Sequence, residues 1–226
     1  MRLTFIIFYG ILLLYACNHK HESKAMQIVD ETNEHIPKDT SSLFFPLDTF
    51  HFTSDSNNRT ADSSIKLRYS EILFRLKEPV LYNYSGKQEI VRFLWIRPFD
   101  NPVVVRVNNL EGTIFANIKE VEPQYYNDIN FVYKIGIDTI VKIDSSKWNK
   151  IISSLQSEGF WNSRTARSYD YEDATFCIIE GFINNRYHCI TRTVEDSFSL
   201  DNVGFVKELY AIGNSILPMK NRREEK

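Results

Sequence analysis

The sequence predicts an α+β fold, an antiparallel sheet of about six strands with three helices packed mainly on one side. Six short runs are rich in β-branched and aromatic residues, as strands are. They are residues 89–97, 103–107, 113–121, 131–143, 175–183 and 186–194. Three longer runs carry apolar residues at helical spacing, in residues 65–77, 145–158 and 203–216. Hairpin connections between successive strands favour an antiparallel sheet.

The composition fits an ordinary globular domain and excludes some functions. The chain has 226 residues, of which 43% are hydrophobic and 25% charged, with a formal net charge of −2. This near balance lacks the basic surplus expected of a nucleic-acid-binding protein. The eight glycines lie too far apart for a G-x-G-x-x-G or P-loop motif. Phosphate-cradling loops of these types are therefore excluded.

The N-terminus has the features of an export signal. Residues 3–16 form an apolar block that follows Arg2 and is too short to span a bilayer comfortably. Ala16 followed by Cys17 resembles a bacterial lipobox, so residues 1–16 are predicted to be a lipoprotein signal peptide. Cys17 would carry the lipid, such as palmitate, and the protein would be exported and anchored on the periplasmic or cell-surface side of a bacterial membrane. The alternatives are an uncleaved short anchor, or a plain signal peptide in which Cys17 is an incidental thiol.

A polar arm precedes the domain. Residues 17–64 are rich in Ser, Thr, Asp and Asn and are predicted to be a flexible tether. Residues 43–52 are an exception because they carry four phenylalanines, and this segment can dock on the domain in extended form. The domain is predicted to span residues 65–218.

The first helix is predicted over residues 65–77, and Glu78-Pro79 ends it because the residue before proline disfavours the α conformation. Residues 89–97 and 103–107 flank a proline-containing turn and predict a buried hairpin. Residues 113–121 and 131–143 extend the sheet.

The C-terminal half supplies two helices and one more hairpin. Asp144 is placed to cap the second helix and Gly159 to end it. Asp201 is placed to cap the third, which Pro218 follows, and residues 219–226 form a charged tail.

The last hairpin turns at Asn184-Asn185, and a two-residue turn fixes its register. Cys177 then faces Arg192 and Cys189 faces Glu180, which puts the two sulfurs on opposite faces of the ribbon. We therefore expect no disulfide.

Candidate catalytic residues are few. His188 is the one histidine in the predicted domain, and no H-x-x-x-H or paired C-x-x-C motif exists, so neither a metal site nor a cofactor is expected. A hydrolase would have to use His188 as its base, with Glu180 to orient it, although the ribbon places the two on opposite faces. A strand histidine satisfied by its neighbours is the simpler interpretation.

Four arginines lie in strands that are otherwise apolar: Arg92, Arg97, Arg106 and Arg192. An unpaired buried charge is very costly, so each must be paired or must point into a polar cleft. Two interpretations follow, an anion-recognition face or a set of internal ion pairs, and the second is the simpler.

The strand beginning Arg92-Phe93-Leu94-Trp95-Ile96-Arg97 and its return Asn101-Pro102-Val103-Val104-Val105-Arg106-Val107 resemble a hallmark of a family of uncharacterised bacterial proteins. Many members of that family are exported or lipidated. The resemblance continues at Glu78-Pro79, Gly159-Phe160-Trp161, Ile179-Glu180-Gly181 and Tyr187-His188, but the aromatic residue expected after Arg192 is missing. It implies no activity. It implies a shared polar site, if one exists, at Arg92, Arg97, Arg106, Glu180, Tyr187, His188 and Arg192.

Together these features predict a membrane-anchored lipoprotein whose domain binds or interacts without catalysis. Its expected partners are the membrane, reached through the lipid, and an envelope protein or a small anionic ligand, with no nucleic acid. The alternative is an envelope hydrolase that uses His188 with Glu180 or an arginine-lined pocket.

Overall fold

The structure is a computed structural model that describes residues 35–39, 41–46, 59–96, 100–125, 131–165, 175–194 and 204–217. All of these belong to one compact unit, Glu31–Lys226. The predicted signal peptide, Cys17, Arg97, Asp201 and the charged tail lie outside the described residues.

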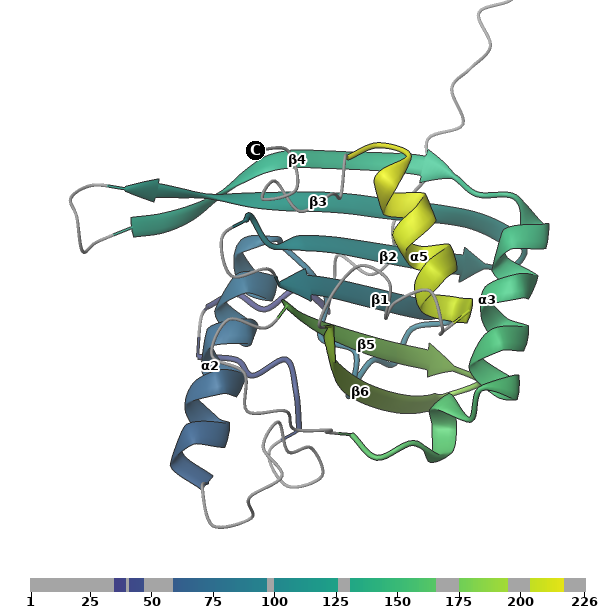
Figure 1. Cartoon of the computed structure of the whole chain (residues 1–226), viewed down its shortest axis with the longest axis horizontal. Coiled ribbons are helices and arrows are strands. Elements are labelled where there is room, and N and C mark those ends of the chain that lie inside the picture. Colours follow the sequence, from purple (N-terminus) through teal and green to yellow (C-terminus); the bar gives the residue numbers. More distant parts are fainter. Residues whose placement is uncertain are drawn as a thin grey trace, which may run out of the picture. The chain divides into compact units, whose positions relative to one another are not determined.

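The sheet has six antiparallel strands in the order β4-β3-β2-β1-β5-β6 (Figure 1). The strands are β1 (Glu89–Ile96), β2 (Val103–Leu110), β3 (Thr113–Tyr125), β4 (Phe131–Lys142), β5 (Thr175–Ile183) and β6 (Arg186–Val194). The described helices are α2 (Arg59–Arg75), α3 (Ser145–Ser157), the short 3-10 helix η2 (Phe160–Asn162) and α5 (Gly204–Asn214). The predicted α+β class and the six-stranded antiparallel sheet are confirmed.

The helices cover both faces of the sheet. Alternate strand residues point to opposite faces, and Phe93 packs with α3 and α5 whereas its neighbour Leu94 packs with α2. Figure 1 shows α5 across the middle strands with α3 beside it. Two of the three predicted helices thus share one side, and α2 lies on the other.

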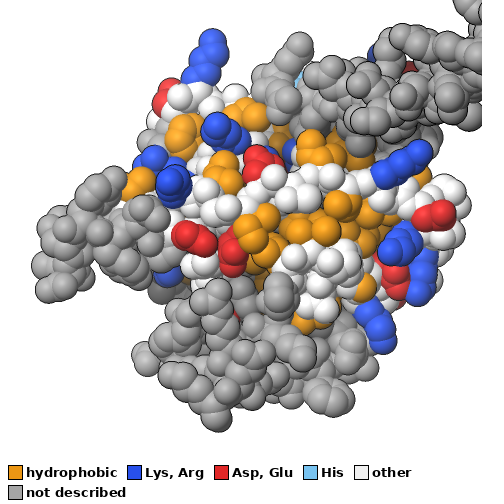
Figure 2. All heavy atoms as spheres, turned by 90° about the horizontal axis from the view of Figure 1, so that it is seen from above, with side chains coloured by type: hydrophobic (Ala, Val, Ile, Leu, Met, Phe, Trp, Pro, Cys, Tyr) orange, Lys and Arg blue, Asp and Glu red, His pale blue; other side chains and the backbone are white. Residues whose placement is uncertain are grey.

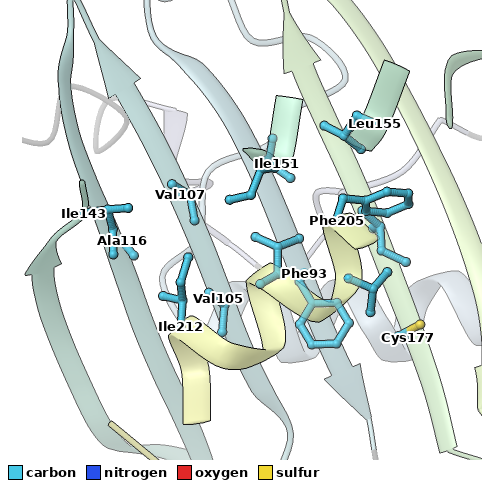
Figure 3. Close-up of a cluster of buried hydrophobic side chains, with 14 of the residues drawn as sticks. Phe93, Val105, Val107, Ala116, Ile143, Ile151, Leu155, Cys177, Phe205 and Ile212 are labelled. Carbon is cyan, nitrogen blue, oxygen red and sulfur yellow. The ribbon is translucent and has the colours of Figure 1, made fainter. Parts of the chain in front are cut away.

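The core under α3 and α5 is apolar and continuous. It includes Phe93, Val105, Val107 and Ala116 from the strands, and Ile151, Leu155, Phe205 and Ile212 from the two helices (Figure 3). All of these side chains are buried. The helices supply this face because their apolar residues recur at helical spacing, as the sequence predicts.

Several local signals act as predicted. Asp144 caps α3 by accepting a hydrogen bond from Ser146 N at 2.7 Å. Gly159 follows the helix with a φ of 69°, in the left-handed region that glycine adopts without strain. The last hairpin turns at Asn184-Asn185, where both φ angles are positive, and Thr175 lies opposite Val194 in its register.

The domain begins earlier than residue 65. Helix α2 starts at Arg59, and Asp62 and Lys66 form a buried ion pair of 2.8 Å one turn apart within it. Part of the predicted tether also belongs to the folded unit. Phe44 and Phe45 are buried against α2 and the sheet, and Phe44 N donates to Ser70 Oγ at 3.0 Å. Docking, which the sequence left open for residues 43–52, is thus observed at Phe44 and Phe45, whereas residues 47–52 lie outside the described residues.

Candidate functional site

A row of polar side chains crosses the α2 face of the sheet. Arg92 of β1 lies directly opposite Arg106 of β2 on one side and Glu180 of β5 on the other. Each of these three residues is at most 1% exposed. Like charges directly opposite each other destabilise a sheet unless carboxylates neutralise them. The row therefore depends on its acidic partners.

Glu180 neutralises Arg92. The Arg92 Nε donates to Glu180 Oε2 at 2.7 Å, and Arg92 Nη1 donates to the carbonyl oxygen of Pro79, also at 2.7 Å. Tyr187 of β6 donates its hydroxyl to the second oxygen of Glu180 at 3.0 Å. The Glu180 carboxylate is thus enclosed by partners from β1 and β6.

Glu78 neutralises Arg106 and reaches two more cations. Its Oε2 lies 2.8 Å from Arg106 Nε and 3.6 Å from Arg92 Nη1, and its Oε1 lies 3.0 Å from Lys119 Nζ. Glu78 is fully buried. One carboxylate therefore stands among three buried cations. We call Arg92, Arg106, Lys119, Glu78 and Glu180 the ionic cluster.

The end of α2 positions Glu78. Lys77 has a φ of 53°, in the left-handed region, and Glu78 N donates to Leu73 O at 3.0 Å, as in a helix C-cap. Lys119 of β3 completes the cap, because its ammonium donates to the carbonyl oxygens of Leu76 at 2.9 Å and Lys77 at 3.2 Å. A cation at this end also suits the helix dipole.

Two asparagines extend the network toward β3. Arg106 Nη1 donates to Asn108 Oδ1 at 2.8 Å, and Asn108 Nδ2 donates to Asn117 Oδ1 at 2.9 Å. Both asparagines are buried. The chain of contacts thus runs from β6 to β3 beneath α2.

The two carboxylates of the ionic cluster titrate in opposite directions. Burial alone would raise the pKa of Glu78, but attraction to Arg106, Lys119 and Arg92 together lowers it below its ordinary value. Burial raises the pKa of Glu180, and Arg92 offsets this only in part while the nearby Glu78 charge adds to it. The difference follows from the number of cations around each carboxylate.

His188 and Arg192 lie on the opposite face of the sheet, the face that α3 and α5 cover, and both contact residues 160–164. His188 pairs across the hairpin with Gly181, and its Nε2 lies 3.1 Å from Ser163 O. Its ring contacts the Phe160 ring edge-on with centroids 5.0 Å apart. Partial burial lowers the pKa of His188. Arg192 donates to the carbonyl oxygens of Thr191 and Arg164.

Of the seven residues predicted to share a polar site, the structure joins Arg92, Arg106, Glu180 and Tyr187. It separates His188 and Arg192 from them by the thickness of the sheet, and Arg97 lies outside the described residues. The prediction of internal ion pairs describes Arg92 and Arg106. The predicted register also holds for the cysteines, since Cys177 and Cys189 are free thiols on opposite faces. Burial raises the pKa of Cys177 to about 12.

Sequence reasoning missed two members of the ionic cluster. In the sequence, Glu78 is predicted to end a helix and belongs to the family resemblance but is not among the predicted site residues, and Lys119 is not singled out within residues 113–121. Lys119 lies two residues after Asn117 and therefore on the same face of β3, but only the structure shows that this face carries the network.

The described residues contain no group of three or more His, Cys, Asp or Glu side chains placed to hold a metal ion. No helix in the described part of the chain is long and apolar enough to cross a membrane. Comparison of the chain with protein-family models, curated proteins and solved structures finds no match. The family resemblance therefore stays a prediction.

Proposed function

We propose that this protein is a membrane-anchored lipoprotein of a bacterial cell envelope whose α+β domain acts by interaction and not by catalysis. The observation that carries the second half of this proposal is the closure of the ionic cluster. Arg92, Arg106 and Glu180 are three of the seven candidate site residues, and they are buried and bonded to one another or to Glu78. Side chains engaged in this way are not available to a substrate.

The hydrolase alternative loses its proposed pair of residues. His188 and Glu180 project from opposite faces of the sheet, so Glu180 does not orient the His188 ring. In a triad-type site a third group within hydrogen-bond reach orients the base. The polar contact of the ring, at Ser163 O, is to a backbone carbonyl, which fits a structural histidine.

Docking of the arm limits how far the domain can lie from a lipid on Cys17. Extended chain spans at most about 3.6 Å per residue, so the 18 residues from Cys17 to His35 reach no more than about 65 Å. If the chain were held only from Arg59 onward, the same limit would be about 150 Å. His35 is held because its carbonyl oxygen accepts a hydrogen bond from Val80 N at 3.1 Å. The proposal thus implies an interaction close to the membrane surface.

Metabolic labelling tests the anchor. The full chain is expressed in a bacterium grown with labelled palmitate, and the label is followed in wild type, Cys17→Ala and Asn18→Ala. We expect the label in wild type and Asn18→Ala, which keeps the thiol, and none in Cys17→Ala. Incorporation that persists in Cys17→Ala would sink the lipoprotein assignment.

Replacement of His188 tests the absence of catalysis. In a bacterium whose envelope phenotype depends on this protein, His188→Gln should complement a deletion as well as wild type does, whereas Cys17→Ala should not. Failure of His188→Gln at a normal protein level would favour the hydrolase instead.

A further inference from the structure

The two edges of the sheet differ in what covers them. Along β6, Thr191 N donates to Thr165 O at 2.6 Å and Thr191 Oγ1 donates to the same oxygen at 3.2 Å, so residues 163–165 cover this edge. Strand β4 forms the other edge and, among the described strands, pairs with β3 alone. A strand of 12 residues whose outer edge is paired with none of the described strands can accept another strand.

The C-terminal half of β4 presents an alternating set of side chains. Asp138, Ile140 and Lys142 lie opposite Lys119, Asn117 and Phe115 of β3, so all three point to the α2 face. All three are exposed, and Ile140 at 45% is among the most exposed large hydrophobic residues described. Asp138 and Lys142 form no ion pair with a described residue. Figure 2 looks down on this edge from above and shows hydrophobic side chains across the middle with charged side chains around them.

A break in β4 limits where a second strand can pair in register. The pairing with β3 shifts between Glu120 and Val121, which leaves Gly136 as an extra residue in β4. Residues on the two sides of a bulge no longer alternate in phase, so a partner strand can match faces along residues 137–142 but not across Gly136.

We propose that β4 pairs antiparallel with β4 of a second copy of this chain, with Ile140 on the two-fold axis. Directly opposite residues of antiparallel strands share a face. With Ile140 opposite itself, Asp138 of each copy lies opposite Lys142 of the other, and Thr139 lies opposite Val141. The exposed isoleucines meet at the centre and an opposite-charge pair stands on each side.

Neighbouring registers lack this match. Centring the pair on Asp138 would oppose two aspartates, and centring it on Thr139 would place Asp138 opposite Ile140. Of these three registers, the one centred on Ile140 alone places opposite charges across the axis, and such self-complementarity is what a two-fold dimer requires. This is why the edge fits a second copy of the chain. The inference depends only on β4 and holds whether or not Cys17 carries a lipid.

Charge reversal tests the partner and the register together. The full chain is solubilised in detergent, and its oligomeric state is measured by sedimentation equilibrium. Wild type should be a dimer. Asp138→Lys and Lys142→Asp should each weaken dimerisation at least about tenfold, because each places two like-charge pairs across the axis. The double variant D138K/K142D restores both opposite-charge pairs and should dimerise like wild type.

Two controls separate this pairing from a general charge effect. Lys134→Asp changes a lysine of the same strand outside the paired stretch and should leave the dimer intact. An equal mixture of the two single variants should form heterodimers, because their charges complement each other. A monomeric wild type, or a double variant that stays monomeric with a native circular dichroism spectrum, would overturn the proposal.

Cross-linking gives an independent readout of the register. Opposite residues of antiparallel strands have Cβ atoms about 4.5–5.5 Å apart, close enough for a disulfide after small adjustments. Ile140→Cys should therefore give an oxidised dimer on a non-reducing gel, and Lys134→Cys, on the same strand, should give far less. Equal cross-linking of the two variants would contradict the register.

Discussion

The two faces of the sheet are stabilised by different means. Under α3 and α5, apolar side chains such as Phe93, Ile151 and Phe205 pack with no requirement for specific partners beyond shape. Under α2, the ionic cluster is buried to the same degree, and each charge is tolerated only because another neutralises it. Equal burial on the two faces therefore does not mean equal tolerance of substitution.

The largest effect is expected at the carboxylate that three cations share. Glu78→Gln keeps the volume but leaves Arg106, Lys119 and Arg92 without its negative charge, so we expect a loss of about 3–5 kcal/mol in the free energy of unfolding. Urea denaturation followed by circular dichroism measures this.

The matched control is Glu71→Gln on the same helix. Glu71 is half exposed and lies 3.5 Å from Arg75, a surface pair that contributes less than about 1 kcal/mol. If the two variants lose similar amounts of stability, the buried charge of Glu78 contributes no more to the free energy of unfolding than an exposed charge does.

The pH dependence separates the two carboxylates. Because the folded state lowers the pKa of Glu78, its stabilising ionisation is present above the ordinary value of 4.5 and is lost as pH falls through the lower folded pKa. The loss in free energy of unfolding that Glu78→Gln causes relative to wild type should therefore become smaller below pH 4.5.

The pKa shift of Glu180 has the opposite direction to that of Glu78. Its folded pKa is raised, so its protonation favours the folded state as pH falls through that raised value toward 4.5. The loss in free energy of unfolding that Glu180→Gln causes relative to wild type should become larger as pH falls over this range. Urea denaturation at a series of pH values measures both, and a parallel response of the two variants would contradict the assigned shifts.

The sequence predicted the apolar face better than the ionic one, for a physical reason. Hydrophobic periodicity and turn residues act locally, so the hairpin at Asn184-Asn185 and the caps at Asp144 and Gly159 could be placed from neighbouring residues alone. The contact of Glu78 with Arg106 joins residues 28 positions apart. The packing of the end of α2 on the sheet brings these two residues together, and no local pattern encodes it.

The arm shows the same limit. Its phenylalanines left docking open, the composition of residues 17–64 is that of a tether, and α2 begins within this segment at Arg59. Local polarity was outweighed by the burial of Phe44 and Phe45 under α2.

Truncation of Phe44 is the next largest effect, since it tests whether the arm is part of the α2 face. Phe44 is fully buried, and its ring centroid lies 5.8 Å from Arg92 Cζ. Phe44→Ala should lower the free energy of unfolding by about 3 kcal/mol and expose residues 35–46 to protease. Phe74→Ala, at the partly buried rim of the same cluster, should cost less. A loss below about 1 kcal/mol with unchanged proteolysis would mean that the arm contributes nothing to this face.

The smallest effect is expected on the apolar face at Gly181, where the contact is steric and not electrostatic. A Cβ at this position would lie 3.0 Å from Phe160 Cε1 and 3.3 Å from Trp161 Cη2, so both rings must move by a few tenths of an ångström. Gly181→Ala should therefore cost about 1–3 kcal/mol, the usual range for overpacking.

A second substitution tests whether the clash with the Phe160 ring causes the loss of stability in Gly181→Ala. Phe160→Leu removes the closest ring, so the double variant G181A/F160L should lose less than the sum of the two single variants. Additive losses in urea denaturation would show that Gly181 is required for another reason. A substantial coupling would instead show that a shape conflict on this face is relieved by adjusting one neighbour. The loss of the Glu78 charge cannot be relieved in this way, because it leaves Arg106 and Lys119 without that carboxylate and Glu180 is already paired with Arg92.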